Sequence, residues 1–167
     1  MNTPGEIRIG RQALTLIDRV LEAAAPEEGC ALLLGLRHGA GEEGVGGAPE
    51  WWRVRRVWPT LNVWEPAEER RRRFQIDPRE QLLAQRWGRL HGLAVLGSVH
   101  SHPGSAATPS STDLTLTYAP TLMVIRGLAE PGRTEEPTPD GDGATELGCW
   151  WLEPQEPPRL LPWTMED

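Results

Sequence analysis

The feature that most constrains the fold of this chain is a pair of histidines, His100 and His102, that directly follows an apolar run. A carboxylate, Asp113, comes after ten intervening residues. Neutral imidazoles and carboxylates are ligands that zinc accepts, and three protein ligands leave a fourth position for water. A chain that uses these residues together must bring the end of a strand and the start of a helix to one point. The spacing therefore favours a catalytic metal site over a closed structural site.

The segment before the histidines predicts how they are presented. Residues 93–99 are mostly apolar and are typical of a central strand that ends in the histidines. Residues two apart in an extended chain point to the same face, so His100 and His102 share a face and Ser101 points away. Pro103 predicts the end of this strand.

The segment after the histidines predicts how the carboxylate reaches the same point. Residues 104–109 contain Gly, Ser and Pro, and they predict a loop in which the chain doubles back. Ser110 then begins a capping sequence for a short helix. Asp113 lies in the first turn of that helix, from which its carboxylate can approach the two histidines.

A hydrolytic metal site also needs a group that moves protons, and a carboxylate is a common choice. Glu27 and Glu28 precede a short apolar run at 30–35, which predicts a strand buried on both faces. Glu28 is the nearer of the two to that strand. If the strands at 30–35 and 93–99 are neighbours, Glu28 can lie over the metal.

The rest of the chain alternates between short strands and helices, so the sequence predicts one layered α/β domain over residues 1–167, with a mixed sheet. Further strands are predicted over 6–9, 51–58, 121–125 and 147–152. Helices are predicted over 14–24 and from Asp77–Pro78 to Gly92, the second with an apolar face of Leu82, Leu83, Trp87 and Leu90. The other segments predict a loop over 38–49, a less regular stretch over 59–76, a mobile acidic loop over 127–144 and an irregular Pro-rich tail over 153–167.

The charge of the chain limits its partners. A net charge of −7 argues against general binding to nucleic acid, because phosphate contacts need clustered cations. The one basic cluster, Arg70–Arg73, follows two glutamates and predicts a solvated surface or a mobile loop, with partner docking as the alternative. No apolar run approaches the roughly 20 residues that cross a membrane. The N-terminal residues lack the pattern of a signal peptide, so we expect a cytoplasmic protein.

The remaining chemically active side chains have simpler interpretations. Cys30 and Cys149 have no second cysteine nearby, so we expect small buried hydrophobic side chains rather than a disulfide framework or a thiolate zinc site. The eight tryptophans follow no period and are interpreted mostly as core or half-buried strand positions, with one or two as walls of a substrate groove. His38, in a polar loop, and His91, at a helix end, are assigned no function.

The site residues together resemble a known motif. Glu28, then His100-Ser101-His102-Pro103, then Ser110 and Asp113 resemble the JAMM motif of the MPN-domain metalloproteases. In that motif an upstream Glu is followed by His-x-His, ten residues and Asp, with a Ser three residues before the Asp.

The flanking segments extend this resemblance. Residues 26–35, PEEGCALLLG, resemble the family's Pro-x-Glu-Ala-Cys-Gly-Leu-Leu-Leu-Gly segment, and 74–78, FQIDP, resemble the segment before the central strand in bacterial members. The resemblance covers about positions 6–126. Ala31 stands where many relatives have Gly, and the loop 38–49 is this chain's own. Neither departure touches a motif position.

The resemblance implies a fold and a role for each motif residue. The implied fold is a single MPN (JAMM) domain of the α/β class, with a mixed curved sheet flanked by helices, of the cytidine-deaminase-like kind. His100, His102 and Asp113 would be zinc ligands, and Glu28 would be the general acid and base. Ser110 would help to hold the oxyanion, beside the metal as Lewis acid.

The implied function is that of a zinc-dependent peptidase or isopeptidase, a hydrolase. Eukaryotic enzymes that this chain resembles remove ubiquitin from lysine side chains. Compact bacterial relatives look like peptidases that trim residues from the Gly-Gly end of ubiquitin-like sulfur-carrier proteins, and a short stand-alone domain suits that role better. An extended substrate tail could pair with a sheet edge near the site by strand addition.

Two other classes are weighed beside this one. A non-catalytic MPN module that binds a partner is the main alternative, although a lost ligand would mark it and none is lost. A zinc-dependent nucleoside or base deaminase needs His-x-Glu and a later Pro-Cys-x-x-Cys, and this chain has neither.

Overall fold

The computed structural model describes residues 3–39, 50–129 and 144–167. The helices and strands, in chain order, are β1 (Glu6–Gly10), α1 (Arg11–Ala24), β2 (Cys30–His38), β3 (Trp51–Thr60), the 3-10 helix η1 (Ala67–Glu69), α2 (Pro78–Leu90), β4 (Ala94–Ala106), α3 (Ser111–Thr115), β5 (Thr121–Leu128), β6 (Thr145–Leu152), β7 (Arg159–Leu161) and β8 (Trp163–Glu166). Every strand and helix predicted from the sequence is present.

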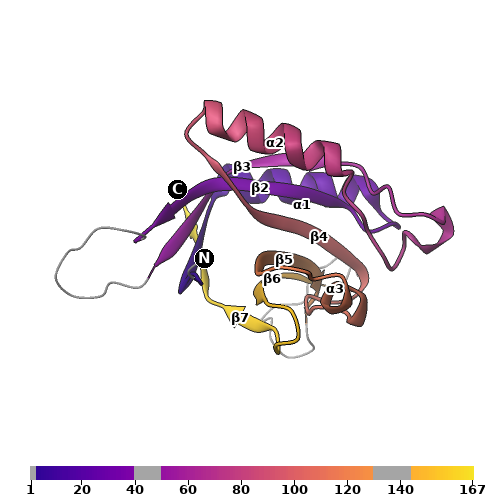
Figure 1. The fold of residues 1–167 in the computed structure, drawn as a ribbon. Helices are drawn as coiled ribbons and strands as arrows, with labels where there is room; N and C mark the ends of the chain where they lie inside the picture. Colours follow the sequence, from indigo (N-terminus) through magenta and orange to yellow (C-terminus); the bar gives the residue numbers. More distant parts are fainter. Residues whose placement is uncertain (1–2, 40–49, 130–143) are drawn as a thin grey trace.

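The strands form one mixed, strongly curved sheet (Figure 1). Its order is β7–β6–β5–β4–β2–β3–β1–β8. The pairs β1–β3, β1–β8 and β4–β5 are parallel, and the other neighbours are antiparallel. Trp52 of β3 and Trp151 of β6 meet edge to face, with ring centroids 5.6 Å apart, although three strands lie between them in the sheet. The sheet therefore curls toward itself, which confirms the predicted single α/β domain with a mixed curved sheet.

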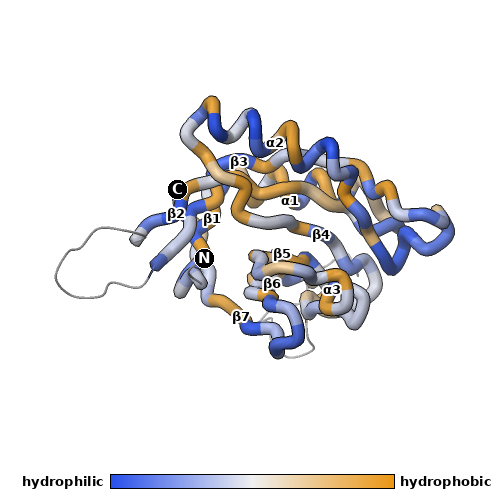
Figure 2. The backbone as a smooth tube through the Cα atoms, viewed as in Figure 1, coloured by the Kyte–Doolittle hydropathy of each residue, from blue (hydrophilic) through white to orange (hydrophobic). Residues whose placement is uncertain are grey.

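The strand β2 lies between two apolar layers, as its continuous apolar run predicts. Ala31 and Leu33 face the main core, which contains the buried side chains of α1, whereas Leu32 and Leu34 face Ala84 of α2. Figure 2 shows hydrophobic residues along β2, β4 and β5, on which this core is built. The two helices therefore cover opposite faces of the sheet.

The buried face of α2 differs from the predicted one. Leu82, Leu83 and Leu90 are 66%, 51% and 76% exposed, whereas Ala84 and Gly88 are buried against the sheet. A Cβ at Gly88 would lie 2.7 Å from the carbonyl oxygen of Leu93, closer than packing allows. The helix approaches the sheet through small residues, so its leucines point outward. The predicted start is confirmed, because Asp77 caps the helix by accepting the backbone N–H of Arg79.

The strand β4 is longer than predicted. Pro103 does not end it, because the strand continues to Ala106, which pairs with Leu128 of β5. The register shifts between Ser101 and Ala106, so the proline occupies a bulge, where its missing N–H breaks no ladder bond. His100 and His102 consequently lie inside β4 rather than at its carboxyl end.

The C-terminal tail is not irregular. Residues 159–161 pair with β6 as β7, and residues 163–166 add β8 alongside β1. Between them, the carbonyl of Pro162 accepts the N–H of Ile7. The two ends of the described chain are therefore tied into one sheet, an arrangement that short segments beside prolines do not reveal on their own.

The structure also bears on the predictions for the cysteines, the tryptophans, the two predicted loops and the absence of a membrane-spanning segment. Cys30 and Cys149 are free and buried, and burial raises the pKa of their thiols to about 11 and about 12. No tryptophan is exposed, which agrees with core and half-buried positions. Most of the predicted loops 38–49 and 127–144 lies outside the described residues, but His38 is the last residue of β2 and 127–128 belong to β5. Within the described residues, no helix is long and apolar enough to span a membrane.

We expect the close approach of β4 and β5 to make Gly97 irreplaceable. A Cβ there would lie 2.0 Å from the carbonyl oxygen of Leu122, so Gly97→Ala should lower the free energy of unfolding by about 2–3 kcal/mol. Gly10→Ala is the matched control, because nothing lies within 4 Å of the added methyl group. Urea unfolding of both variants measures the difference. Equal stabilities would show that β4 and β5 are not packed this closely.

Candidate metal centre

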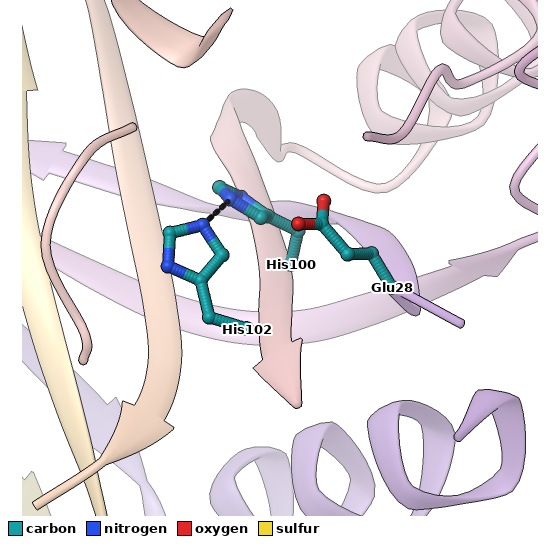
Figure 3. Close-up of side chains that lie close together, drawn as sticks. All are labelled: Glu28, His100 and His102. Atoms are coloured by element: carbon teal, nitrogen blue, oxygen red, sulfur yellow. Dashed lines mark hydrogen bonds between the residues drawn. The ribbon is translucent and has the colours of Figure 1, made fainter. Parts of the chain in front are cut away.

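The pairing of β2 with β4 brings three polar side chains together. Cys30 pairs with His100 in this antiparallel register, so Glu28, just before β2, lies beside the end of the histidine motif. One ligand atom from each of Glu28, His100 and His102 lies within 4.8 Å of the others, and all three residues are buried. Figure 3 shows a ring nitrogen of His102 facing a ring nitrogen of His100, with the Glu28 carboxyl group beside the rings. The predicted adjacency of the two strands is confirmed.

The Asp113 carboxylate reaches the same histidines from α3. Its oxygens Oδ1 and Oδ2 lie 3.4 Å from Nε2 of His100 and 3.4 Å from Nε2 of His102, respectively. Ser110 is the N-cap: its backbone N–H and hydroxyl donate to Oδ2 at 2.7 and 2.9 Å, and its Oγ accepts the Asp113 N–H. The capping box thus fixes the direction of this carboxylate. The structure therefore brings together the histidines and both carboxylates that the sequence singled out.

The histidine rings are held so that their Nε2 atoms face each other at 3.0 Å. Nδ1 of His102 lies 2.9 Å from the carbonyl oxygen of Ala106, which can only accept, so this nitrogen carries the proton. In the neutral ring, Nε2 of His102 is then the lone-pair nitrogen. The His100 ring stacks on Phe74, with centroids 4.3 Å apart. Both Nε2 atoms are thereby directed to one point.

Burial and the neighbouring charges perturb the pKa values of these groups. Burial lowers the pKa of His100 and favours its neutral form. Burial opposes ionisation of Asp113, but the neighbouring imidazoles of His100 and His102 and the hydrogen bonds from Ser110 outweigh it, and the pKa of this carboxyl lies well below its usual range. Burial, reinforced by the charge of Asp113, raises the pKa of Glu28 to about 7. One carboxylate therefore stays ionised, while the other can exchange a proton near neutral pH.

The backbone around Glu28 is fixed by bonds to two segments. The N–H of Gly29 donates to Oγ of Ser101 at 2.8 Å, and the N–H of Ser101 donates to the carbonyl of Gly29 at 3.0 Å. The N–H of Glu28 donates to the carbonyl of Arg70 at 2.8 Å. Ser101 points away from the site as predicted, and it links the strand of the histidines to the segment that contains Glu28.

Asn62 is a site-supporting residue that the sequence reasoning missed. Its amide Nδ2 donates to the carbonyls of Glu28 at 3.0 Å, Arg73 at 2.8 Å and, more weakly, Arg70 at 3.4 Å. Its Oδ1 accepts the backbone N–H groups of Trp64 and Gln75 at 3.1 and 3.2 Å. One side chain therefore ties the segment before α2 to the residue that carries the candidate base. The asparagine lies far from the motif in sequence, so no spacing signal could have identified it.

The arginine cluster has a structural part and an open part. Arg70 is not a free surface cation: its guanidinium bonds the carbonyl of Trp64 and pairs with Glu65. Arg71 and Arg72 line a hollow of about 410 Å³ that they share with Glu28, His102 and Ser110. His38 stacks on Trp51 and His91 stacks on Trp87, so both of these histidines lie away from the site.

The donor set fits a divalent metal ion. Two imidazole nitrogens and two carboxylates converge in a buried site. Nδ1 of His102 is hydrogen bonded to a backbone carbonyl and leaves Nε2 for a metal ion, an arrangement typical of metal-binding histidines. Within the described residues, Nδ1 of His100 has no hydrogen-bond partner. The atom of His100 that would bind a metal ion is Nε2, which faces the other ligands. Such a constellation can hold a metal ion and place a carboxylate of suitable pKa beside it.

Comparison with known proteins places this geometry in context. The family model described as prokaryotic homologs of the JAB domain matches residues 11–138. A solution structure from Desulfitobacterium hafniense is 25% identical, with a TM-score of 0.74, and the match covers 96% of this chain and 93% of that one. A solution structure from Salinibacter ruber is 28% identical, with a TM-score of 0.58 and coverage of 96% and 92%. A JAB1/MPN domain protein from Archaeoglobus fulgidus is 18% identical, with a TM-score of 0.44 and coverage of 95% and 96%. A search of curated proteins found no match.

We expect Asn62→Ala to destabilise the protein by about 3 kcal/mol, because it leaves backbone groups around Glu28 and Trp64 without partners. Gln85→Ala, which removes an exposed amide side chain from α2, is the control and should change stability by less than about 0.5 kcal/mol. Chemical denaturation measures both. A neutral Asn62→Ala would mean that this side chain does not hold the segment in place.

Proposed function

Because the chain belongs to the family of prokaryotic homologues of the JAB domain, we propose that it is a zinc-dependent peptidase or isopeptidase of the JAMM type. The observation that carries the proposal is the convergence of the Nε2 atoms of His100 and His102, 3.0 Å apart, with the carboxylates of Glu28 and Asp113 at the same point. His100, His102 and Asp113 are the proposed ligands, and Glu28 remains for proton transfer.

The mechanism follows from what each residue can do. A zinc ion bound by the three ligands supplies Lewis acidity, which polarises a carbonyl group and makes water more acidic. Glu28, with its pKa raised to about 7, accepts the proton of the attacking water and passes it to the departing amine. Ser110, which donates to Asp113 in this structure, turns its hydroxyl toward the carbonyl oxygen as negative charge develops there.

The proposed substrate is the Gly-Gly end of a ubiquitin-like or sulfur-carrier protein, which the family resemblance suggests. The edge strands of the sheet are β7 and β8, whereas the site lies on the inner strand β4. The ladder between β2 and β4 ends at the pair Cys30–His100, and Ser101 still bonds the carbonyl of Gly29, so β4 beyond Ser101 lacks a partner from β2. An extended substrate tail would pair there rather than at an outer edge of the sheet.

We expect the wild-type chain to bind one zinc ion. Loss of a residue that only hydrogen bonds to a metal ligand typically weakens metal binding by roughly 10–100-fold. Asp113→Ala removes a proposed ligand itself, so it should weaken zinc binding by more than that. Asp167→Ala, which removes an exposed carboxylate, is the control and should bind zinc like the wild type. Native mass spectrometry gives the stoichiometry, and competition with a chromophoric chelator gives the affinity. A folded wild type that takes up no zinc would instead favour a non-catalytic MPN module.

We expect Glu28→Gln to retain zinc and to lower turnover by at least about 100-fold, because the amide cannot shuttle the proton. Glu27→Gln is the matched control at the adjacent position and should stay within about twofold of the wild type. The assay is the release of residues placed after the Gly-Gly of a sulfur-carrier protein, followed by mass spectrometry. Undiminished turnover in the zinc-loaded Glu28→Gln variant would remove Glu28 from the mechanism.

A further inference from the structure

An apolar pocket of about 530 Å³ opens beside the candidate metal centre, a size within the range of ligand-binding pockets. Its apolar walls are Trp64, Phe74, Leu116, Tyr118 and Met123. Among its lining residues Asp113 is the one charged side chain. The pocket therefore touches the proposed ligand set on one side and offers hydrophobic surface elsewhere.

Two contacts make the pocket continuous with the site. Asp113 lines the pocket and also approaches both histidine Nε2 atoms. Phe74 forms a wall of the pocket and stacks on the His100 ring, with centroids 4.3 Å apart. A substrate side chain in the pocket would therefore be separated from the proposed ligand His100 by the Phe74 ring. Consecutive Cα atoms are about 3.8 Å apart, so that side chain belongs to a residue near the reacting amide.

The pocket walls are unusually apolar for solvent-facing positions. Tyr118 is 83% exposed and Leu116 is 40% exposed, so each presents apolar surface to water. Phe74 and Tyr118 are the only phenylalanine and tyrosine of the chain, and both line this pocket. Exposed apolar surface gathered around a hollow is typical of a binding site.

A second hollow at the site has the contrary chemistry. It is lined by Glu28, Arg71 and Arg72 together with residues 102–105 of β4 and Ser110. A substrate with one polar and one large apolar neighbour at the reacting amide would fit the two hollows in a single orientation.

From this geometry we infer that the pocket binds a bulky apolar side chain, aromatic or leucine-like, of the substrate residue beside the scissile bond. That this residue belongs to a cleaved substrate depends on the proposed function. Binding of such a side chain in the pocket does not depend on it. Leu116, Tyr118 and Met123 are then specificity-determining residues.

Met123 offers a direct probe of binding that needs no catalysis. The chain has three methionines, and Met165, 48% exposed on β8, serves as an internal reference. With ¹³C-methyl-labelled methionine in the full chain, N-acetyl-phenylalaninamide and N-acetyl-leucinamide should shift the Met123 methyl resonance in a saturable way and leave Met165 unchanged. N-acetyl-alaninamide and N-acetyl-glutaminamide should not.

Two variants test whether the response comes from this pocket. Ala119→Trp places an indole at an exposed lining position and should abolish the Met123 shift, while Ala23→Trp on the exposed side of α1 should not. Tyr118→Ala removes an exposed wall and should weaken binding at least threefold, whereas Leu90→Ala on α2 should have no effect. A Met123 resonance that ignores all ligands, or responds equally to alanine and phenylalanine derivatives, overturns the inference.

Peptide cleavage separates this inference from the proposed function. One peptide series varies the residue after a Gly-Gly bond and a second varies the residue before the two glycines, with Ala, Leu, Phe and Glu at each position. The wild type should prefer Phe or Leu over Ala by at least tenfold in one series, which identifies the side of the bond. Ala119→Trp should lose that preference and still cleave the Ala peptide. A preference that persists in Ala119→Trp overturns the inference. A selective Met123 shift without cleavage of any peptide supports the pocket and counts against the peptidase.

Discussion

The pairing of β2 with β4 is the constraint on which the rest of the site depends. The Cys30–His100 register and the reciprocal bonds between Gly29 and Ser101 hold the segment of the proposed base against the strand of the histidines. A slip by one residue would turn the histidines to the other face of the sheet, into the apolar core that contains Val99. The chemistry of the site is therefore a consequence of strand register.

Glu28, His100, His102 and Asp113 are buried at this point, and the two carboxylates differ in how far their charge is compensated. Burying a charge is costly unless it is paired and hydrogen bonded. Asp113 accepts hydrogen bonds from the cap and lies 3.4 Å from Nε2 of each histidine, so it remains ionised. Glu28 has less compensation and its pKa rises to about 7, which leaves it able to gain or lose a proton. The same burial that destabilises an ionised Glu28 is what suits it to proton transfer.

Local patterns predicted most of the fold and singled out His100, His102 and Asp113, whereas the choice of Glu28 depended on a strand pairing and on the family resemblance. The spacing of His100 and His102 on a strand and the cap at Ser110 are local features, so they could be inferred without tertiary contacts. The buried face of α2 could not, because Gly88 rather than a leucine decides how closely the helix approaches the sheet. The strands of the tail were missed for a similar reason: their partners lie far away in sequence. Asn62 supports the site through backbone groups, which side-chain patterns do not reveal.

The segment between β3 and α2 connects the proposed base with the apolar pocket. Asn62 fixes it, its Arg70 carbonyl accepts the N–H of Glu28, and its Trp64 and Phe74 side chains form walls of the apolar pocket. Phe74 also supports the His100 ring. The proposed base, one proposed ligand and the pocket are therefore positioned by a single irregular stretch held by one asparagine. A change in this stretch that altered the pocket would also move Glu28 or His100, so selectivity and proton transfer would change together. Substitutions at Tyr118 or Leu116, which lie at or beyond the end of α3, can alter the pocket without that coupling.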